Sequence, residues 1–506
     1  RRKAGALLGA ALAVALCAGA AAHDRPVELH GSGTTNPSKL VWLAIDDLTA
    51  RANPEVHITY RAVGSGTGQH EFVGEANEAG AFAPYTHFGS GDIPLKEEDF
   101  DAVKAAGREP LHVPYVLGAI SVFHSVPGVE SGSGGLNMTG CLLSQIFRRD
   151  ITTWDHPSIL RFNPGLQGVP AGTPISVVRR VHGSSSTASF TEYLHVACPS
   201  EWPAELVGKT VDWPEGTVAA QGSDGVSDAL DAAPYSIGYI DAGHGHRLGL
   251  KEIELQNADG RYIDSKRANV GAAAARALAQ GLLPSSLDQS CHRVKLLNMP
   301  GPDTWPIVAM SYFYLDRDLT ALGDSGPLLK AFVEYVLSPE VQGTADSEGK
   351  IAQFGFSPVP PEVMALNRQA LDSLQTAGQA WTFESADETI KGGGALEYVF
   401  SGKRQAYGAY QRENLALQIK GLAGRLDGVQ AESGRPADAQ PASQVSLPAS
   451  SDDDGDGGDR ALVLAALSLS VVSLVVALAS CGALLHMRSK VKHLRASDTE
   501  SLATKV

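Results

Sequence analysis

Short apolar runs alternate with helical patterns and glycine turns from about residue 27 to residue 370. This alternation limits the possible folds more than any other feature, because strands and helices that alternate along a chain form α/β domains. Pro327 is predicted to be the first residue of a helix. Strands are predicted at 56–60 and 175–178, and helices at 39–52 and 327–337. With 506 residues, the chain is too long for one small domain.

Residues 1–22 have the features of a secretory signal peptide. They begin with Arg1, Arg2 and Lys3, continue with uncharged residues and end in small ones. A lipoprotein would use Cys17, but Leu16 before it is bulkier than such sites prefer. We therefore expect an exported protein.

A second apolar segment, residues 461–485, contains no charged residue and is long enough to cross the hydrocarbon core of a bilayer. Aspartates between 452 and 459 precede it, and four basic residues follow it between 488 and 495. The positive-inside rule then places residues 486–506 in the cytosol and the rest of the chain outside. The sequence predicts a single-pass protein of the cell surface, with a buried core helix as the alternative.

Between these parts, residues 371–430 are predicted to form a partly helical extension, and residues 431–460 an acidic linker without periodicity. Apolar residues recur in the extension at spacings of four and three: Leu415, Ile419, Leu422, Leu426 and Val429. Such a seam could pair weakly with a second chain. Three glycines within it favour the alternative, a frayed surface helix.

Three cysteines, Cys141, Cys198 and Cys291, lie in the exported part. They permit one disulfide with one thiol left over, and the sequence does not say which pair forms it. Because no CxxC motif or His/Cys cluster is present, we expect no structural zinc and no cofactor. The sequon at Asn137 would accept a glycan in a eukaryotic host.

Three segments place glycine and hydroxyl-bearing residues directly before a predicted helix: residues 31–35, 64–68 and 183–187. A helix start presents unpaired N–H groups and the positive end of its dipole, and the hydroxyls add further donors. Each segment is therefore a candidate anion site, with ordinary N-capping as the alternative. The net charge of −15 argues against a nucleic acid as the anion, because that binding needs clustered basic residues.

Two charged residues add to this pattern. Arg180 ends the strand before the third segment and can form a charge-assisted contact with an oxyanion. Asp92 follows a glycine turn, and a carboxylate suits an anion site only when the anion carries a proton, as hydrogen phosphate does and sulfate does not. Asp92 as a simple turn cap is the alternative.

The order of these segments resembles that of the periplasmic phosphate-binding proteins of bacterial phosphate uptake. Further landmarks of that family follow in the same order: Ile146 to Asp155, Asn163 to Gly165, Tyr235 to Tyr239 and Trp305 to Ile307. The resemblance covers roughly residues 27–370. It implies a phosphate ligand, and a permease as partner.

The resemblance also implies a set of phosphate-binding residues: Thr35, Asn36, Ser65, Asp92, Arg180, Ser184, Ser185 and Ser186. Most would donate through hydroxyl and backbone groups, whereas Asn36 and Ser185 would donate through backbone N–H. Arg180 would pair with the anion and Asp92 would accept its proton. The family usually has an aromatic residue, glycine and threonine where Asn36, Ser185 and Ser186 stand, and backbone donation survives all three changes.

His182 is the departure with the largest expected consequence. The family has an acidic residue there that pairs with the binding arginine, and a neutral imidazole cannot replace it. We expect phosphate affinity to change as His182 gains or loses its proton. The alternative is that His182 faces solvent.

The resemblance implies a two-lobed α/β fold of the venus-flytrap type, in which the ligand bridges the lobes. The first lobe would comprise 27–115 and 306–370, and the second 116–305. The expected function is phosphate capture without bond breaking. A phosphatase is one alternative, although HExxH and GxSxG motifs are missing from the sequence. A receptor for another oxyanion is the other.

Overall fold

The computed structural model describes residues 25–421, apart from 77–81, 133, 292–293, 345, 388–389, 391–396, 409, 412–413, 416 and 419–420. The predicted signal peptide, acidic linker, membrane helix and cytosolic tail lie outside the described residues. No described helix combines the length and the apolar character needed to cross a bilayer. By their contacts, the described residues up to Gln418 form one compact unit.

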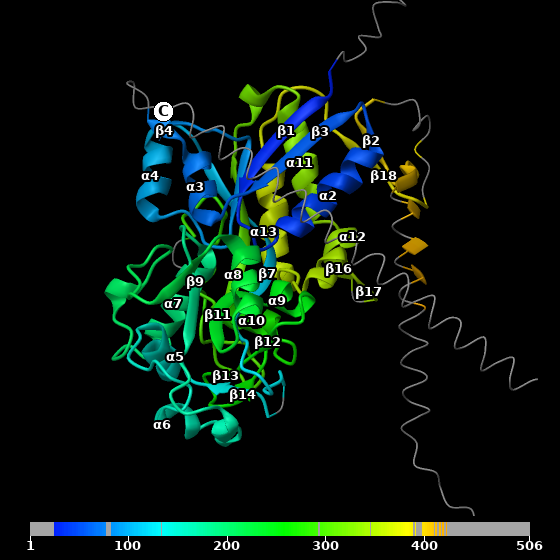
Figure 1. Cartoon of the computed structure of the whole chain (residues 1–506). Helices are drawn as coiled ribbons and strands as arrows, with labels where there is room; N and C mark the ends of the chain where they lie inside the picture. Colours follow the sequence, from blue (N-terminus) through cyan, green and yellow to red (C-terminus); the bar gives the residue numbers. More distant parts are fainter. Residues whose placement is uncertain are drawn as a thin grey trace, which may run out of the picture. The chain divides into compact units, whose positions relative to one another are not determined.

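The unit that ends at Gln418 is built on one large sheet (Figure 1), in which β12 also pairs with β7. Its strands are, in spatial order, β10 (Thr217–Ala220), β9 (Ser176–Arg180), β11 (Ser236–Asp241), β7 (Pro110–His124), β15 (Val308–Asp316), β6 (Phe88–Gly91), β1 (Val27–Gly33) and β3 (Val56–Ala62), with β12 at Lys251–Glu252. The smaller sheets are β14 (Tyr262–Ile263) with β13 (Glu254–Gln256) and β8 (Asn137–Met138), β18 (Thr382–Glu384) with β19 (Val399–Ser401) and β2 (Ala52–Asn53), β4 (Glu75–Ala76) with β5 (Phe82–Ala83), and β16 (Gly343–Thr344) with β17 (Ser347–Glu348).

Strand β7 belongs to both lobes. Its first part pairs antiparallel with β15, and its last five residues pair antiparallel with β11. Every residue of β7 is buried, as expected for a strand covered on both faces. The predicted lobe boundary at residues 115–116 falls within this strand.

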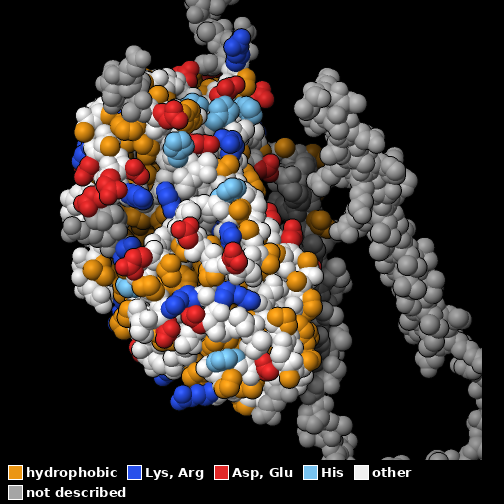
Figure 2. Space-filling model, turned by 60° about the vertical axis from the view of Figure 1, so that its left-hand side comes forward, with side chains coloured by type: hydrophobic (Ala, Val, Ile, Leu, Met, Phe, Trp, Pro, Cys, Tyr) orange, Lys and Arg blue, Asp and Glu red, His pale blue; other side chains and the backbone are white. Residues whose placement is uncertain are grey.

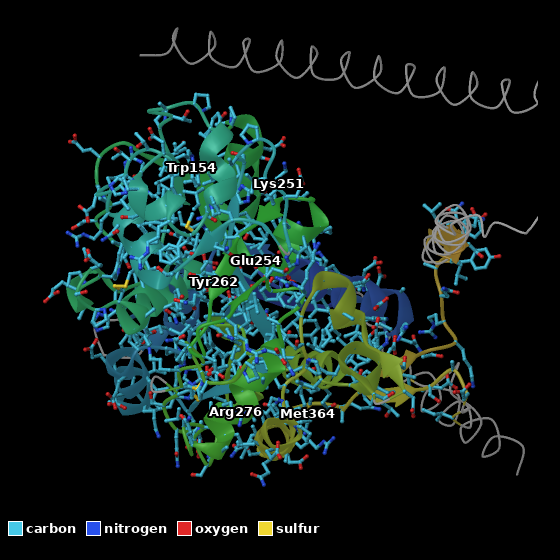
Figure 3. The ribbon with its side chains drawn as sticks, turned by 90° about the horizontal axis from the view of Figure 1, so that it is seen from below. Trp154, Lys251, Glu254, Tyr262, Arg276 and Met364 are labelled. Atoms are coloured by element: carbon cyan, nitrogen blue, oxygen red, sulfur yellow. A yellow bond between two sulfur atoms is a disulfide. The ribbon has the colours of Figure 1, made fainter. Side chains whose placement is uncertain are left out.

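The helices pack on both halves of the sheet. Those of the first lobe are α2 (Ser38–Arg51), α3 (Ser65–Val73), α4 (Glu97–Ala105), α11 (Ser325–Val336), α12 (Pro339–Gln342) and α13 (Pro361–Asp372). Those of the second are α5 (Gly140–Phe147), α6 (Pro157–Leu160), α7 (Ser185–Ala197), α8 (Gly222–Ala232), α9 (Ala242–Arg247) and α10 (Val270–Ala279). Short 3-10 turns occur at η1 (Pro164–Gly168), η2 (Ala204–Leu206), η3 (Thr320–Leu322) and η4 (Lys350–Phe354). Helices α10 and α13, which carry the labelled Arg276 and Met364 in Figure 3, both pack against β7.

Helix α2 shows why the first lobe folds as it does. Leu40, Ala44 and Leu48 recur every four residues, so they lie on one face of the helix, and all three are buried. This helix connects the parallel strands β1 and β3 and packs against β3. Parallel neighbours need such a crossover, so the short apolar runs and the helix between them form one βαβ unit.

The predicted helix at 327–337 begins two residues earlier than expected. Helix α11 starts at Ser325, so the prediction that Pro327 is its first residue is wrong. Pro327 still lies in the first turn, where backbone N–H groups have no partner within the helix. The missing N–H is therefore tolerated at the third position as well.

The predicted extension packs partly onto the first lobe. Strand β19 pairs with β18 and with β2, so residues after 380 join the segment that follows α2. Trp381 and Phe400 are buried in the core of that lobe. Of the predicted heptad-like seam, Leu415 is described, and its side chain is exposed.

The second lobe contains the disulfide, between Cys141 of α5 and Cys198 after α7. Cys291 is a free thiol among the described residues, and burial raises its pKa to about 12. Asn137, the predicted glycosylation site, lies half-buried in β8. Its Nδ2 donates to the carbonyl of Phe162 over 3.3 Å, so a glycan would have to break this bond.

Candidate functional site

The three predicted anion segments lie at the starts of α2, α3 and α7. Ser184 is the N-cap of α7, and Ser65 is the first residue of α3. The second and third segments touch across the lobes, because a methyl group placed on Gly66 would lie 3.3 Å from the carbonyl oxygen of Gly183. The glycines are therefore needed for close packing of the two loops.

Asp92 follows β6 and stands at the centre of a hydrogen-bond network. Its Oδ2 accepts from the hydroxyl of Thr34 at 2.6 Å, from the hydroxyl of Ser185 at 2.6 Å and from Nδ2 of Asn36 at 2.8 Å. Its Oδ1 accepts from the hydroxyl of Ser311 at 2.7 Å. Asp92 is 4% exposed, so the network joins both lobes inside the protein.

The electrostatics of Asp92 reflect two opposing causes. Burial raises the pKa of this carboxyl above its ordinary value. Hydrogen bonds from Ser185, Thr34 and Ser311 and the charge of Arg180 act in the other direction. The carboxylate is thus surrounded by donors, as an acceptor in an anion site has to be.

Arg180 ends β9 and is 6% exposed. Its Nε is a buried donor with no hydrogen-bond partner among the described residues, and a methyl group on Gly64 would lie 3.9 Å from one of its terminal nitrogens. Burial lowers the pKa of the guanidinium, whereas Tyr239 and Asp92 oppose this shift. A buried cation with an unpaired N–H is costly unless an anion compensates it.

The serine hydroxyls at the helix starts keep a hydrogen to donate. Ser65 Oγ accepts from the backbone N–H of Asp92 at 3.3 Å, and Ser184 Oγ accepts from that of Thr187 at 3.4 Å. Both residues are 1% exposed. Since each oxygen is already an acceptor, its own O–H is left as a donor inside the site.

Asn36 departs from its expected role. Its backbone N–H donates to the hydroxyl of Thr34 at 3.2 Å, so this group already has a partner. Its side chain lies 3.3 Å from Ser186 Oγ and 3.4 Å from Ser223 Oγ. The amide therefore links α2 to the starts of α7 and α8.

Ser223 was missed by the sequence analysis. It lies in the first turn of α8, is buried and comes within 3.4 Å of the Thr35 hydroxyl. Residues Gly222 and Ser223 repeat the glycine–hydroxyl pattern of the three predicted segments, which is the signal that could have found them. Thr34 and Ser311 were also missed as partners of Asp92. Ser311 lies within β15, and no local motif marks it.

His182 lies beside the site, and its side chain is exposed, whereas Arg180 two residues earlier is buried. The solvent-facing alternative considered for this histidine agrees with that exposure. Its effect on Arg180 remains a prediction.

A family model described as the PBP superfamily domain matches residues 19–340, which is more than half of the chain. The chain belongs to the PBP superfamily. Within this superfamily, phosphate-binding protein PstS of Methanocaldococcus jannaschii is 28% identical over 350 residues, covering 68% of this chain and 85% of the relative. The family resemblance seen in the sequence is confirmed.

Two solved structures share this fold. A high affinity periplasmic phosphate-binding protein, PfluDING, bound with phosphate, has a TM-score of 0.50 and 21% identity, covering 68% of this chain and 93% of its own. A phosphate-binding protein from Stenotrophomonas maltophilia has a TM-score of 0.51 and 19% identity, with 68% and 94% covered. The two-lobed α/β fold is confirmed, and these relatives are binding proteins, not enzymes.

Proposed function

We propose that this protein binds one inorganic phosphate where the starts of α2, α3 and α7 meet between the lobes. The buried guanidinium of Arg180, whose Nε has no hydrogen-bond partner in the part of the chain that the structure describes, is the observation that carries the proposal. A tetrahedral oxyanion would accept from this N–H and balance its charge. The names of the PstS and PfluDING relatives support phosphate as that anion.

The proposed ligand contacts come from both lobes. Hydroxyl and backbone donors of Thr35 and Ser65 belong to the first lobe. Those of Ser184 and Ser186, and the backbone N–H of Ser185, belong to the second. A phosphate held by all of them would favour the closed arrangement of the lobes, because it binds that arrangement with more contacts. Asn36 would act through its side chain, since its N–H is bonded to Thr34.

Asp92 would accept the proton of hydrogen phosphate. Its Oδ2 has three donors, whereas Oδ1 has one, Ser311, and keeps capacity for a second. Sulfate brings no proton at neutral pH and would be repelled by the carboxylate. The proposed site therefore discriminates by protonation rather than by size.

The proposed setting is the cell exterior. The signal peptide at 1–22 would export the chain, and the helix at 461–485 would anchor it with a short cytosolic tail. PfluDING is a periplasmic protein, which supports an exported location. Captured phosphate would pass to a permease in the same membrane.

Isothermal titration of the purified full chain with phosphate, arsenate and sulfate tests the proposal. We expect phosphate and arsenate, which both carry a proton, to bind, and sulfate to bind at least about 100-fold more weakly. Asp92→Asn should narrow this gap, since its amide can donate to sulfate. Tighter binding of sulfate than of phosphate by the wild type, or no binding of phosphate, would refute the assignment.

A further inference from the structure

Two neighbouring strands at the amino end of the first-lobe sheet present a group of metal-ligating side chains. In the register of β1 and β3, Glu28 is the partner of His57, and His30 is the partner of Thr59. Side chains two residues apart on a strand point to the same face, and Leu29 and Ile58 between them are buried. Glu28, His30 and His57 therefore share the outer face. Figure 2 shows histidine and acidic side chains gathered at the upper end of the molecule.

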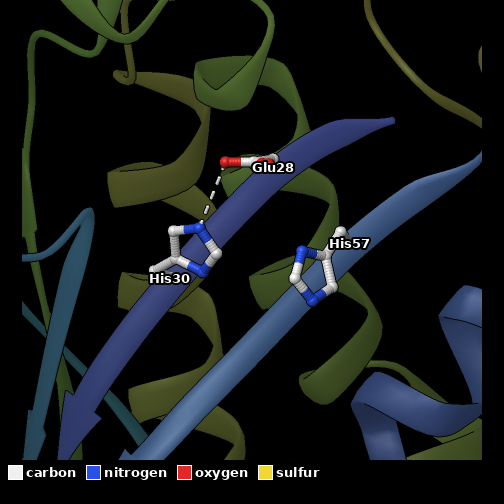
Figure 4. A group of neighbouring side chains, drawn as sticks. All are labelled: Glu28, His30 and His57. Carbon is white, nitrogen blue, oxygen red and sulfur yellow. Dashed lines mark hydrogen bonds and ion pairs between the residues drawn. The ribbon is translucent and has the colours of Figure 1, made fainter. Parts of the chain in front are cut away.

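The three side chains approach one another closely (Figure 4). One potential ligand atom from each lies within 4.8 Å of the other two. The Nε2 of His30 is 3.4 Å from Oε2 of Glu28. In a tetrahedral zinc site with bonds of 2.0–2.1 Å, ligand atoms are about 3.3 Å apart. The Glu28–His30 pair already has this spacing, and His57 is exposed, so its ring is free to turn toward them.

The surroundings of His30 fix the orientation of its ring. Its Nδ1 is 2.7 Å from the hydroxyl of Thr59. In the tautomer with the proton on Nδ1, this hydroxyl accepts the bond and Nε2 keeps a free lone pair toward Glu28. Metal-binding histidines almost always have such a partner on the other ring nitrogen.

His87 supports the cluster without joining it. Its Nδ1 accepts from the backbone N–H of His30 at 2.8 Å, so this nitrogen is not free for a metal. Its ring stacks on that of His30 with centroids 5.6 Å apart. Together with Thr59, it holds His30 from two sides.

We propose that Glu28, His30 and His57 form a binding site for a divalent transition metal of the zinc class. Two imidazoles and one carboxylate suit zinc and disfavour magnesium, which prefers oxygen ligands alone. Three protein ligands leave a fourth position for water or an external ligand. The site lies at the opposite end of β1 from the phosphate site, about 20 Å away along a strand that rises about 3.3 Å per residue.

Zinc titration tests this proposal on the full chain, purified without a histidine tag, treated with a chelator and kept in phosphate-free buffer. We expect one zinc ion per chain by calorimetry, no binding of magnesium, and at least about tenfold weaker zinc binding in both His57→Ala and Glu28→Gln. His70→Ala is the matched control, because His70 is an exposed histidine of α3 outside the cluster, and it should bind zinc like the wild type.

Thermal unfolding without metal checks that each variant is folded. Absence of zinc binding to the wild type would overturn the proposal, and so would equal zinc affinity in the wild type, His57→Ala and Glu28→Gln. Phosphate titration of the same variants keeps this test separate from the proposed function. Normal phosphate binding by His57→Ala with weakened zinc binding is the expected result.

Discussion

The two ends of strand β1 differ in chemistry although the strand is only seven residues long. At its amino end, Glu28 and His30 offer a carboxylate and a ring nitrogen at the surface. Past its carboxyl end, Thr34 is buried among hydroxyl donors, and α2 begins shortly after. In parallel sheets the carboxyl edge meets helix starts, whose N–H groups and dipoles attract anions. The amino edge lacks this bias, so acceptor side chains can gather there for a cation.

Replacing Arg180 should weaken only the anion end, by which we mean the proposed phosphate site past the carboxyl end of β1. Arg180→Ala removes the buried cation, and truncating one member of a buried charge pair costs about 2–5 kcal/mol. Phosphate affinity measured by calorimetry should therefore fall by about a thousandfold, while zinc affinity stays unchanged. Arg179→Ala is the matched control, since Arg179 is the less buried neighbour and bonds Thr217. If Arg180→Ala bound phosphate as tightly as the wild type, the proposed anion site past the carboxyl end of β1 would be contradicted.

Asp241 is a second buried carboxyl, and the charge of Asp92 acts on it. Its ionisation tests whether a negative charge is stabilised in this part of the protein. Burial raises its pKa to about 7, and the charge of Asp92 adds to the rise. The backbone N–H of His244, which donates to Oδ1 of Asp241 at 2.8 Å, acts in the opposite direction. The protonated form favours the fold, so this contribution is complete below about pH 4 and is lost as the pH rises through 7.

Urea unfolding at pH 4, 6 and 8 measures the effect. Between pH 4 and pH 8 the wild type should lose a few kcal/mol of unfolding free energy relative to Asp241→Asn. The asparagine keeps Oδ1 for the bond from His244, so the start of α9 is preserved. Parallel pH profiles for the two proteins would mean that Asp241 ionises at its ordinary pKa.

Thr59→Val tests the proposed metal site at the amino end of β1. It removes the oxygen bonded to Nδ1 of His30 but keeps the shape and the β-branched side chain suited to a strand. Zinc affinity should fall about tenfold, as for other partners of metal-binding histidines, and phosphate affinity should not change. Calorimetry with both ligands provides the measurement. Equal losses for both ligands would indicate general damage to β1.

The smallest expected effect concerns His182. His182→Asp restores the acidic residue of the family and should change phosphate affinity a few-fold, with a pH dependence different from that of the wild type. The exposed side chain limits the size of the effect, because solvent screens its charge. If phosphate affinity varies identically with pH in the two proteins between pH 5.5 and pH 8, His182 does not influence phosphate binding.

Much of the fold follows from local patterns. The apolar run of β3 and the four-residue spacing of Leu40, Ala44 and Leu48 in α2 predict a strand and a helix from local sequence alone. The glycine–hydroxyl motifs predict the starts of α3 and α7 for the same reason, since capping and dipole effects are local.

Contacts between residues far apart in the sequence could not be predicted from local patterns. Ser311 meets Asp92 only because β15 is inserted between β7 and β6, and nothing near Ser311 in the sequence marks it. The metal cluster likewise depends on the register between β1 and β3, which joins Glu28 to His57. The choice of Cys198 over Cys291 as the partner of Cys141 has the same origin, because it requires the packing of α5 on α7.

The position of β15 has a consequence for synthesis on the ribosome. This strand lies between β7 and β6, yet it emerges roughly 180 residues after β7 ends. At about 5–20 residues per second, β6 and β7 wait for roughly 10–40 s before the strand that joins them exists. During that interval both present unpaired edges, the kind of surface to which other strands add. The nascent first lobe therefore needs chaperone protection during this interval, in which the second lobe, continuous in sequence, is still being synthesised.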